Sequence, residues 1–155
     1  MAYDKVKKYF AERGLENRIK VLKTSSATVE MAAEALDCEA KQIAKTLSFL
    51  VEKSPVLVVA AGNVKMDNKK FKSRFGTRPK MIPGKLVEEM IGHDVGGVCP
   101  FVLKPEVKVY LDVSLKQNEI IYPAAGSENS LIELSIEELE EHCIFQEWVD
   151  VSKYQ

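Results

Sequence analysis

The spacing of apolar residues along the chain predicts an alternation of helices and strands. Val6 and Phe10 recur at the spacing of one helix face, and Gly14 follows them as a stop. Thr28 and Asp67 precede two further helical patterns and carry the side-chain oxygens that cap helix N-termini. Helices are therefore expected at residues 4–13, 28–36, 67–75 and 83–90, and from Ser135 onward.

Between these segments the apolar residues form continuous or alternating runs. Residues 56–61 are all apolar, which indicates a buried strand. Strands are expected at 18–22, 42–51, 56–61, 78–82, 107–113, 120–122 and 131–134, with a loop over 92–105. Because helices and strands follow no regular βαβ rhythm, the chain is predicted to be an α+β domain with a mixed, mostly antiparallel sheet.

Composition narrows the class of protein and is compatible with the predicted α+β domain. The chain has 155 residues, 46% hydrophobic and 29% charged, which is typical of one soluble globular domain over residues 1–155. Its first residues lack a signal-peptide core, and no apolar stretch is long enough to cross a membrane. Three widely spaced cysteines, two histidines and no CxxC motif argue for a cytoplasmic protein without a disulfide framework or a metal site.

Charge is distributed unevenly along the chain. Between residues 65 and 85 there are eight Lys or Arg side chains and one acid, Asp67. Between residues 128 and 150 there are eight acids and no Lys or Arg. The basic block is consistent either with a face that binds a polyanion or with a solvated helix face.

Lys45 is the most unusual residue of the predicted strand at 42–51, because most of its neighbours are apolar or small. Its ammonium group must either reach water or serve a site. Further along, Gly96-Gly97-Val98-Cys99-Pro100-Phe101 is a stretch rich in exposed backbone. A fixed cation and a glycine-rich loop together could bind a carbonyl or a phosphate. The plainer alternatives are a lysine that covers apolar surface and an ordinary turn.

Several motifs stand in an order that resembles a known family. They are Thr28-Val29-Glu30 with Ala32-Ala33 and Leu36, Gln42-Ile43-Ala44-Lys45-Thr46-Leu47, Gly92-His93, Gly96-Gly97-Val98-Cys99-Pro100-Phe101, and Ala125-Gly126-Ser127 with Asn129. Together, from about residue 21 to about residue 139, they resemble the YbaK/EbsC family. That family includes the editing domain of bacterial prolyl-tRNA synthetase and its free-standing relatives.

The resemblance implies a curved mixed sheet surrounded by helices, and a free-standing aminoacyl-tRNA deacylase that needs no metal or cofactor. Its expected partner is a mischarged tRNA of the proline type carrying a small amino acid, with an aminoacyl-tRNA synthetase as a further candidate. By analogy, Lys45 is the catalytic residue and residues 96–100 face the ester. The candidate substrate-binding residues are Thr24, Ser25, Ser26, His93, Gly96, Gly97, Val98, Cys99, Pro100, Gly126, Ser127 and Asn129. The candidate tRNA-binding residues are Lys65, Lys69, Lys70, Lys72 and Arg74.

The sequence departs from the family pattern at two places. Members that remove cysteine tend to carry Asp before their Ile-Glu-Leu strand, where this chain has Leu131. They also tend to have an aromatic residue near the end of the first strand, where this chain has Leu22, Lys23 and Thr24. Both departures weaken the case for cysteine as the amino acid removed.

The chemistry allows three interpretations. In a deacylase, backbone N–H groups at Gly96 and Gly97 would stabilise the oxyanion, because glycine permits close approach and positive φ. A non-catalytic module of the same fold would bind a tRNA end, a nucleotide or a synthetase. A cysteine hydrolase would use Cys99 with His93, although a buried structural thiol is the plainer alternative. The stretch at 126–129 is either a turn or a loop that reaches the tRNA 3′ end.

Overall fold

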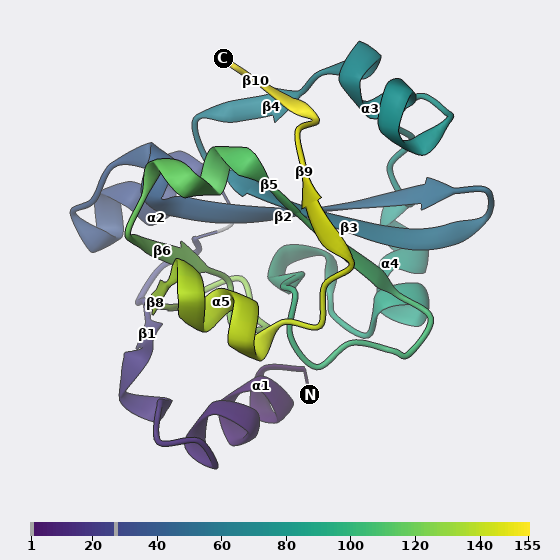
Figure 1. Ribbon diagram of the computed structural model, residues 1–155. Coiled ribbons are helices and arrows are strands. Elements are labelled where there is room, and N and C mark those ends of the chain that lie inside the picture. The colour runs from purple at the N-terminus through teal and green to yellow at the C-terminus, as the bar shows by residue number, and fades with distance from the viewer. Residues whose placement is uncertain (1, 27) are drawn as a thin grey trace.

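The computed structural model, which describes residues 2–26 and 28–155, shows a mixed β-sheet with helices packed around it (Figure 1). The strands of the main sheet lie in the order β8 (Leu134–Ser135), β6 (Ile120–Pro123), β2 (Ile43–Val51), β3 (Ser54–Ala61), β5 (Lys108–Asp112) and β9 (Glu147–Val149). Two small ribbons join β1 (Ile19–Val21) to β7 (Ser130–Ile132) and β4 (Val64–Met66) to β10 (Ser152–Tyr154). The helices are α1 (Ala2–Ala11), α2 (Val29–Leu36), α3 (Asn68–Phe75), α4 (Gly84–Ile91) and α5 (Ile136–His142), with short 3-10 turns η1 (Glu16–Arg18), η2 (Ala40–Gln42), η3 (Val95–Gly97) and η4 (Val113–Gln117).

The β2–β3 hairpin is the centre of the sheet. Its pairing runs from Ala44 opposite Ala61 to Val51 opposite Ser54. The neighbours β6 and β5 run parallel to β2 and β3 respectively, and β9 runs parallel to β5. Of the seven pairings between the described strands, four are antiparallel and three are parallel. The predicted α+β class and mixed sheet are confirmed.

The sheet separates two apolar clusters. On one face, Phe71 and Phe75 of α3 pack against Phe49 of β2 and Tyr110 of β5. On the other face, α1, α4 and α5 bury their apolar side chains around residues such as Leu57. Figure 1 shows this division, with α3 above the β2–β3 hairpin and the other three helices below it. The helix α2 closes one end of the sheet over Ile43 and Leu131.

Local signals fixed most of the helix ends. Thr28 caps α2 by accepting the Met31 N–H, and Asp67 caps α3 by accepting the N–H groups of Lys69 and Lys70. The helix α3 then ends at Gly76, whose φ of 80° is easy only for glycine. None of the helices that the structure describes is long and apolar enough to cross a membrane.

The structure corrects the strand prediction at four places. Residues 78–82 form no strand and make a single bridge, between Met81 and Phe49. The three-residue strands β4, β9 and β10 were not predicted. The strand β10 is also held by the buried carboxylate of Asp112, which accepts the Val151 N–H at 2.9 Å and the Ser152 hydroxyl at 2.6 Å. The C-terminal tail is therefore part of the packed structure.

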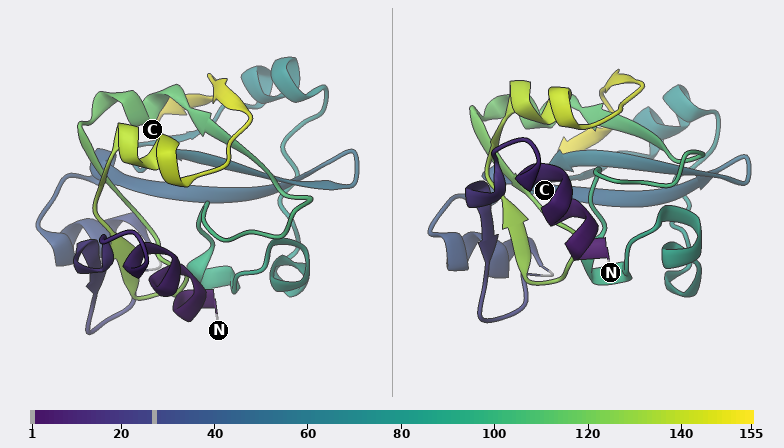
Figure 2. Two further views of the ribbon diagram at one scale, coloured as in Figure 1. Left: turned by 60° about the horizontal axis from the view of Figure 1, so that its bottom comes forward. Right: turned by 90° about the horizontal axis from the view of Figure 1, so that it is seen from below.

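The N-terminal helix α1 packs against two loops, one that carries Phe101 and one that carries Gly126. Figure 2 shows its first turn beside the segment that carries η3. The ring of Phe10 packs edge-on against Phe101 at 5.0 Å between ring centroids. The backbone of Ala2 and Tyr3 lies so close to Gly126 that a side chain at that glycine would approach within 2.9 Å.

Candidate active site

The strand β2 has an unpaired stretch on one edge. On that edge β6 pairs with β2 only at Ile43 and Ala44. The segment before α4 then takes over, because the Ile82 N–H donates to the Ser48 carbonyl at 3.0 Å. Between these two partners the edge faces a cavity of about 240 Å³. The cavity is lined by Ser26, Thr28, Val29, Ile43, Ala44, Lys45, Thr46, Leu47, Val95, Gly96, Val98, Ala124 and Leu131.

Lys45 is the one cation among the described residues that line this cavity. Alternate residues of a strand share a face, so Lys45 projects between Ile43, which packs under α2, and Leu47, which packs beside α3. Its ammonium group donates to the Val64 carbonyl of β4. Burial lowers the pKa of Lys45, and the nearby carboxylate of Glu30 partly opposes this.

Thr46 presents polar atoms at the same edge. In an antiparallel hairpin, alternate residues point their N–H and C=O groups away from the partner strand. Because Ser48 and Leu50 bond to the segment before α4, the same alternation directs the backbone of Thr46 toward the cavity. The hydroxyl of Thr46 is buried and has no hydrogen-bond partner among the described residues.

The glycine-rich loop lines the same cavity as Lys45, through Gly96 and Val98. Neither Gly96 nor Gly97 has a positive φ, so that part of the expectation is wrong. Gly97 is required for close packing, because a Cβ there would lie 2.7 Å from the backbone of Gly126 and Ser127. Its N–H donates to the Asp94 carbonyl at 2.9 Å, so it is not free to bind an oxyanion.

A second loop, residues 124–129, lies against the glycine-rich loop, since the backbone of Gly126 and Ser127 approaches Gly97. The carbonyl of Glu128 accepts the Ser26 N–H at 2.6 Å and the Ser26 hydroxyl at 2.9 Å. Asn129 exchanges two hydrogen bonds with the backbone of Leu22, and the Ser127 hydroxyl donates to the Asn129 side chain. Ser127 and Asn129 therefore fix the loop, while Ser26 reaches the cavity.

Four of the residues predicted for the site line the cavity together: Lys45, Gly96, Val98 and Ser26. Others do not line it, among them the buried residues Gly97, Pro100 and Gly126. Thr24 and Ser25 belong to the loop before Ser26 and do not line it. Sequence reasoning gave no role in the site to Thr46 or Val95, although Thr46 directly follows Lys45 in the motif.

His93 and Cys99 are in contact but are sealed from solvent. The Cys99 Sγ lies 3.5 Å from the His93 Nε2, which itself hydrogen-bonds with the Phe101 carbonyl at 2.8 Å. Both side chains are buried, and neither lines the cavity. Burial raises the pKa of Cys99 to about 12 and lowers that of His93. The thiol is therefore neutral and inaccessible, which contradicts the cysteine-hydrolase interpretation.

Most of the cavity wall is apolar. Leu131, which stands where the resemblance predicted Asp for removal of cysteine, is buried and forms part of this wall. Further apolar wall residues are Val29, Ile43, Ala44, Leu47, Val98 and Ala124. Within residues 2–26 and 28–155, no three His, Cys, Asp or Glu side chains are grouped so that they could hold a metal ion.

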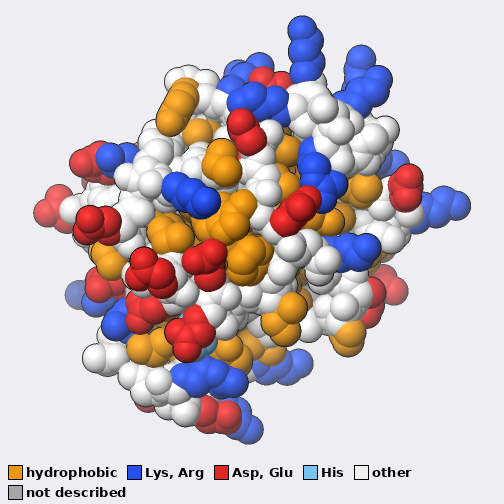
Figure 3. All heavy atoms as spheres, in the orientation of Figure 1, with side chains coloured by type: hydrophobic (Ala, Val, Ile, Leu, Met, Phe, Trp, Pro, Cys, Tyr) orange, Lys and Arg blue, Asp and Glu red, His pale blue; other side chains and the backbone are white. Residues whose placement is uncertain are grey.

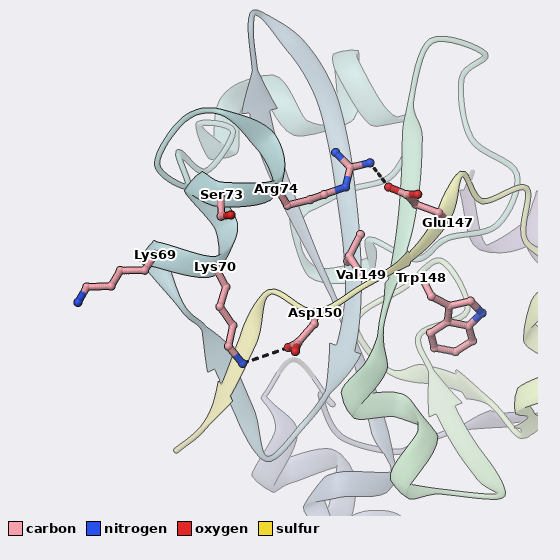
Figure 4. A pocket seen from close by; sticks show the side chains of 8 residues that line it. All are labelled: Lys69, Lys70, Ser73, Arg74, Glu147, Trp148, Val149 and Asp150. Atoms are coloured by element: carbon pink, nitrogen blue, oxygen red, sulfur yellow. Dashed lines mark hydrogen bonds and ion pairs between the residues drawn. The ribbon is translucent and has the colours of Figure 1, made fainter.

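The basic block is partly neutralised by the acidic tail. Figure 3 shows Lys and Arg side chains gathered around α3 at the top of the molecule and acidic side chains over α5. Figure 4 shows Lys70 paired with Asp150 and Arg74 paired with Glu147, while Lys69 points away. The predicted tRNA-binding set therefore divides into two paired residues and three others, Lys65, Lys69 and Lys72, that are exposed.

Comparison with known proteins identifies the family. Residues 23–142 match the sequence profile of the aminoacyl-tRNA editing domain. The chain is 46% identical over 154 residues to the uncharacterized protein YwhH of Bacillus subtilis, covering 99% of this chain and 98% of that protein. It is 33% identical over 112 residues to EbsC of Enterococcus faecalis, covering 71% of this chain and 68% of EbsC. The name of EbsC assigns it provisionally as a Cys-tRNA(Pro)/Cys-tRNA(Cys) deacylase.

The fold agrees with this assignment. A crystal structure described provisionally as a trans-editing enzyme for prolyl-tRNA synthetase superimposes with a TM-score of 0.86 at 26% identity. The match covers 98% of this chain and 97% of that structure. The chain is therefore a member of the aminoacyl-tRNA editing domain family.

Proposed function

We propose that this protein is a free-standing aminoacyl-tRNA deacylase that removes a small amino acid from a mischarged tRNA of the proline type. One observation carries the proposal: Lys45 and the Gly96 loop line one small cavity together. Membership of the editing family and the names of its relatives supply the reaction class.

The reaction needs a stabilised oxyanion more than a nucleophilic side chain. Water attacks the ester carbonyl, the carbon–oxygen bond to the ribose breaks, and the ribose oxygen leaves with a proton. The Lys45 ammonium has three N–H groups, of which one donates to Val64, so two remain for the substrate. Together with the backbone N–H groups of Thr46 and Gly96, it would bind the charge that develops on the carbonyl oxygen. We assign the base to a water or to the free hydroxyl of the ribose.

The cavity favours a small, uncharged amino acid. Its volume of about 240 Å³ leaves little room for a large side chain, and apart from Lys45 its described wall is uncharged and mostly apolar. Synthetases discriminate poorly among such residues, because one methylene changes binding by only about 1–3 kcal/mol. Leu131 makes alanine or another aliphatic residue a better candidate than cysteine.

The tRNA backbone would approach across β4 and α3. The Val64 carbonyl links Lys45 to β4, which leads through Lys65 into the basic helix. Because Lys70 and Arg74 are already paired, Lys69 and Lys72 are the better phosphate ligands. Lys69→Gln should lower the slope of log affinity against log salt by about 0.9, whereas Lys53→Gln at the β2–β3 turn should not.

A deacylation screen tests the proposed function. Purified protein is incubated with tRNAs mischarged with alanine, serine, cysteine and threonine, and the loss of esterified amino acid is followed over time. We expect the fastest loss from a small aliphatic charge such as alanine. If every tRNA keeps its amino acid at the spontaneous rate while still binding, the non-catalytic binding module is correct instead.

A further inference from the structure

Glu128 places a carboxylate beside the mouth of the cavity. If Gly96 carried a Cβ, that atom would lie 3.0 Å from the Glu128 Cβ and 3.4 Å from its Oε2. Because Gly96 lines the cavity and has no side chain, nothing from that residue separates the carboxylate from the cavity. The Glu128 side chain is exposed.

The structural role of this residue belongs to its backbone alone. The Glu128 carbonyl accepts both hydrogen bonds from Ser26, which joins the loop of Glu128 to the segment that carries Ser26. Its carboxylate forms no hydrogen bond or ion pair with any part of the chain that the structure describes. The fold therefore fixes the position of the Glu128 backbone, while its carboxylate has no partner within the described part of the chain.

We infer that Glu128 binds the α-ammonium group of the aminoacyl ester, and that the substrate class is esters with a free α-amino group. This inference rests on the proposed function, because it concerns the same cavity. The α-ammonium group of an aminoacyl ester is cationic, and the carbonyl oxygen beside it becomes negative during hydrolysis. Glu128 and Lys45 present the complementary charges, so the pair would fix the orientation of the ester in the cavity.

This arrangement would distinguish an aminoacyl-tRNA with a free α-amino group from one whose α-amino group is acylated. An N-acetylated or N-formylated amino acid has lost the cation, so it would leave the Glu128 carboxylate without a partner. An ion pair at a solvent-exposed mouth changes affinity by up to about fivefold, and a charge-assisted hydrogen bond adds to this. Glu128 would therefore act in specificity, while Lys45 acts on the ester.

A binding experiment tests the inference independently of catalysis. The probes are 3′-alanylamino-3′-deoxyadenosine, an amide analogue that cannot be deacylated as an ester, and its N-acetyl derivative, at pH 6.5 where an α-amino group is protonated. We expect wild-type protein to bind the free amine about five- to tenfold more tightly than the acetylated probe. Glu128→Gln should abolish that preference. Glu106→Gln, an exposed carboxylate beside the β2–β3 turn, should retain it.

The result also separates this inference from the proposed function. A preference that persists in Glu128→Gln, or equal binding of both probes by wild type, would overturn the role of Glu128. Failure of wild type to bind either probe would overturn it as well. Hydrolysis of alanyl-tRNA, measured separately, decides only whether the protein is a deacylase, so each idea can fail while the other stands.

Discussion

Gly97→Ala should move the two loops of the site apart. The new Cβ would lie 2.7 Å from the backbone of Gly126 and Ser127, whereas ordinary contact begins at 3.4 Å. The loops must therefore separate by about 0.7 Å, the difference between these two distances. Backbone atoms cannot rotate away as a flexible side chain can, so the strain should cost about 1–3 kcal/mol.

Two assays follow this change. In thermal unfolding, a loss of about 1–3 kcal/mol in a chain of this size corresponds to a drop in Tm of about 2–12 °C. The second assay is single-turnover deacylation. Separation of the loops would displace Gly96 from the cavity wall, and a misplacement of about 1 Å lowers a rate by up to about 100-fold. We expect a loss of about 10- to 100-fold, measured at a temperature where the variant remains folded.

The matched control is Gly84→Ala at the start of α4. A Cβ there would meet only the Val95 side chain, at an ordinary 3.6 Å, and no positive φ is needed. Its Tm and activity should stay close to those of wild type. If Gly97→Ala behaves like this control in both assays, the close approach of the two loops does not shape the site.

Three further predictions concern the cavity wall, the buried thiol and the cation. Leu131→Ala should lower the free energy of unfolding, measured in urea, by about 2–5 kcal/mol and should enlarge the cavity. The rate of deacylation of tRNAs that carry larger aliphatic residues should then rise relative to the rate for alanyl-tRNA. An unchanged ratio of these two rates would exclude Leu131 from the wall that sets specificity. Iodoacetamide should leave the activity of the folded protein unchanged, because the Cys99 thiol is buried with a pKa of about 12; inactivation that Cys99→Ala prevents would contradict this. Because burial lowers the pKa of Lys45 and the charged form is the active one, the rate above spontaneous hydrolysis should fall with rising pH before an ordinary lysine would lose its proton at about 10.4. An enzymatic rate that stays level through that range would refute a cationic role.

Elements with local signals could be predicted from the sequence. The two ends of α3 are examples. Asp67 caps the start of the helix with a side-chain acceptor, and Gly76 ends it because glycine tolerates a positive φ. Both signals lie within a few residues of the helix end that they determine. The strands β4 and β10 were missed because each has three residues and depends on a partner far along the chain, as in the pairing of Ser152 with Met66. Short strands of this kind have too little pattern of their own.

The site could be predicted only in part, because some of its features depend on partners far along the chain. Lys45 and Gly96 stood out as residue types that do not suit their surroundings, and both line the cavity. The unpaired edge around Thr46 could not be foreseen, since it arises where two long-range partners of β2 leave a gap. The ion pairs of Lys70 and Arg74 likewise depend on the folded position of the acidic tail.

The central claim is that the Lys45 ammonium stabilises the reacting ester, and one comparison tests it most directly. Single-turnover deacylation of alanyl-tRNA is measured for wild type, for Lys45→Met, and for Lys41→Met, a half-buried lysine outside the cavity wall. Loss of one charge-stabilising donor costs about 100- to 1000-fold, so Lys45→Met should fall by that factor with its Tm within a few degrees of wild type. Lys41→Met should remain active. A folded Lys45→Met that deacylates at the wild-type rate would contradict the account.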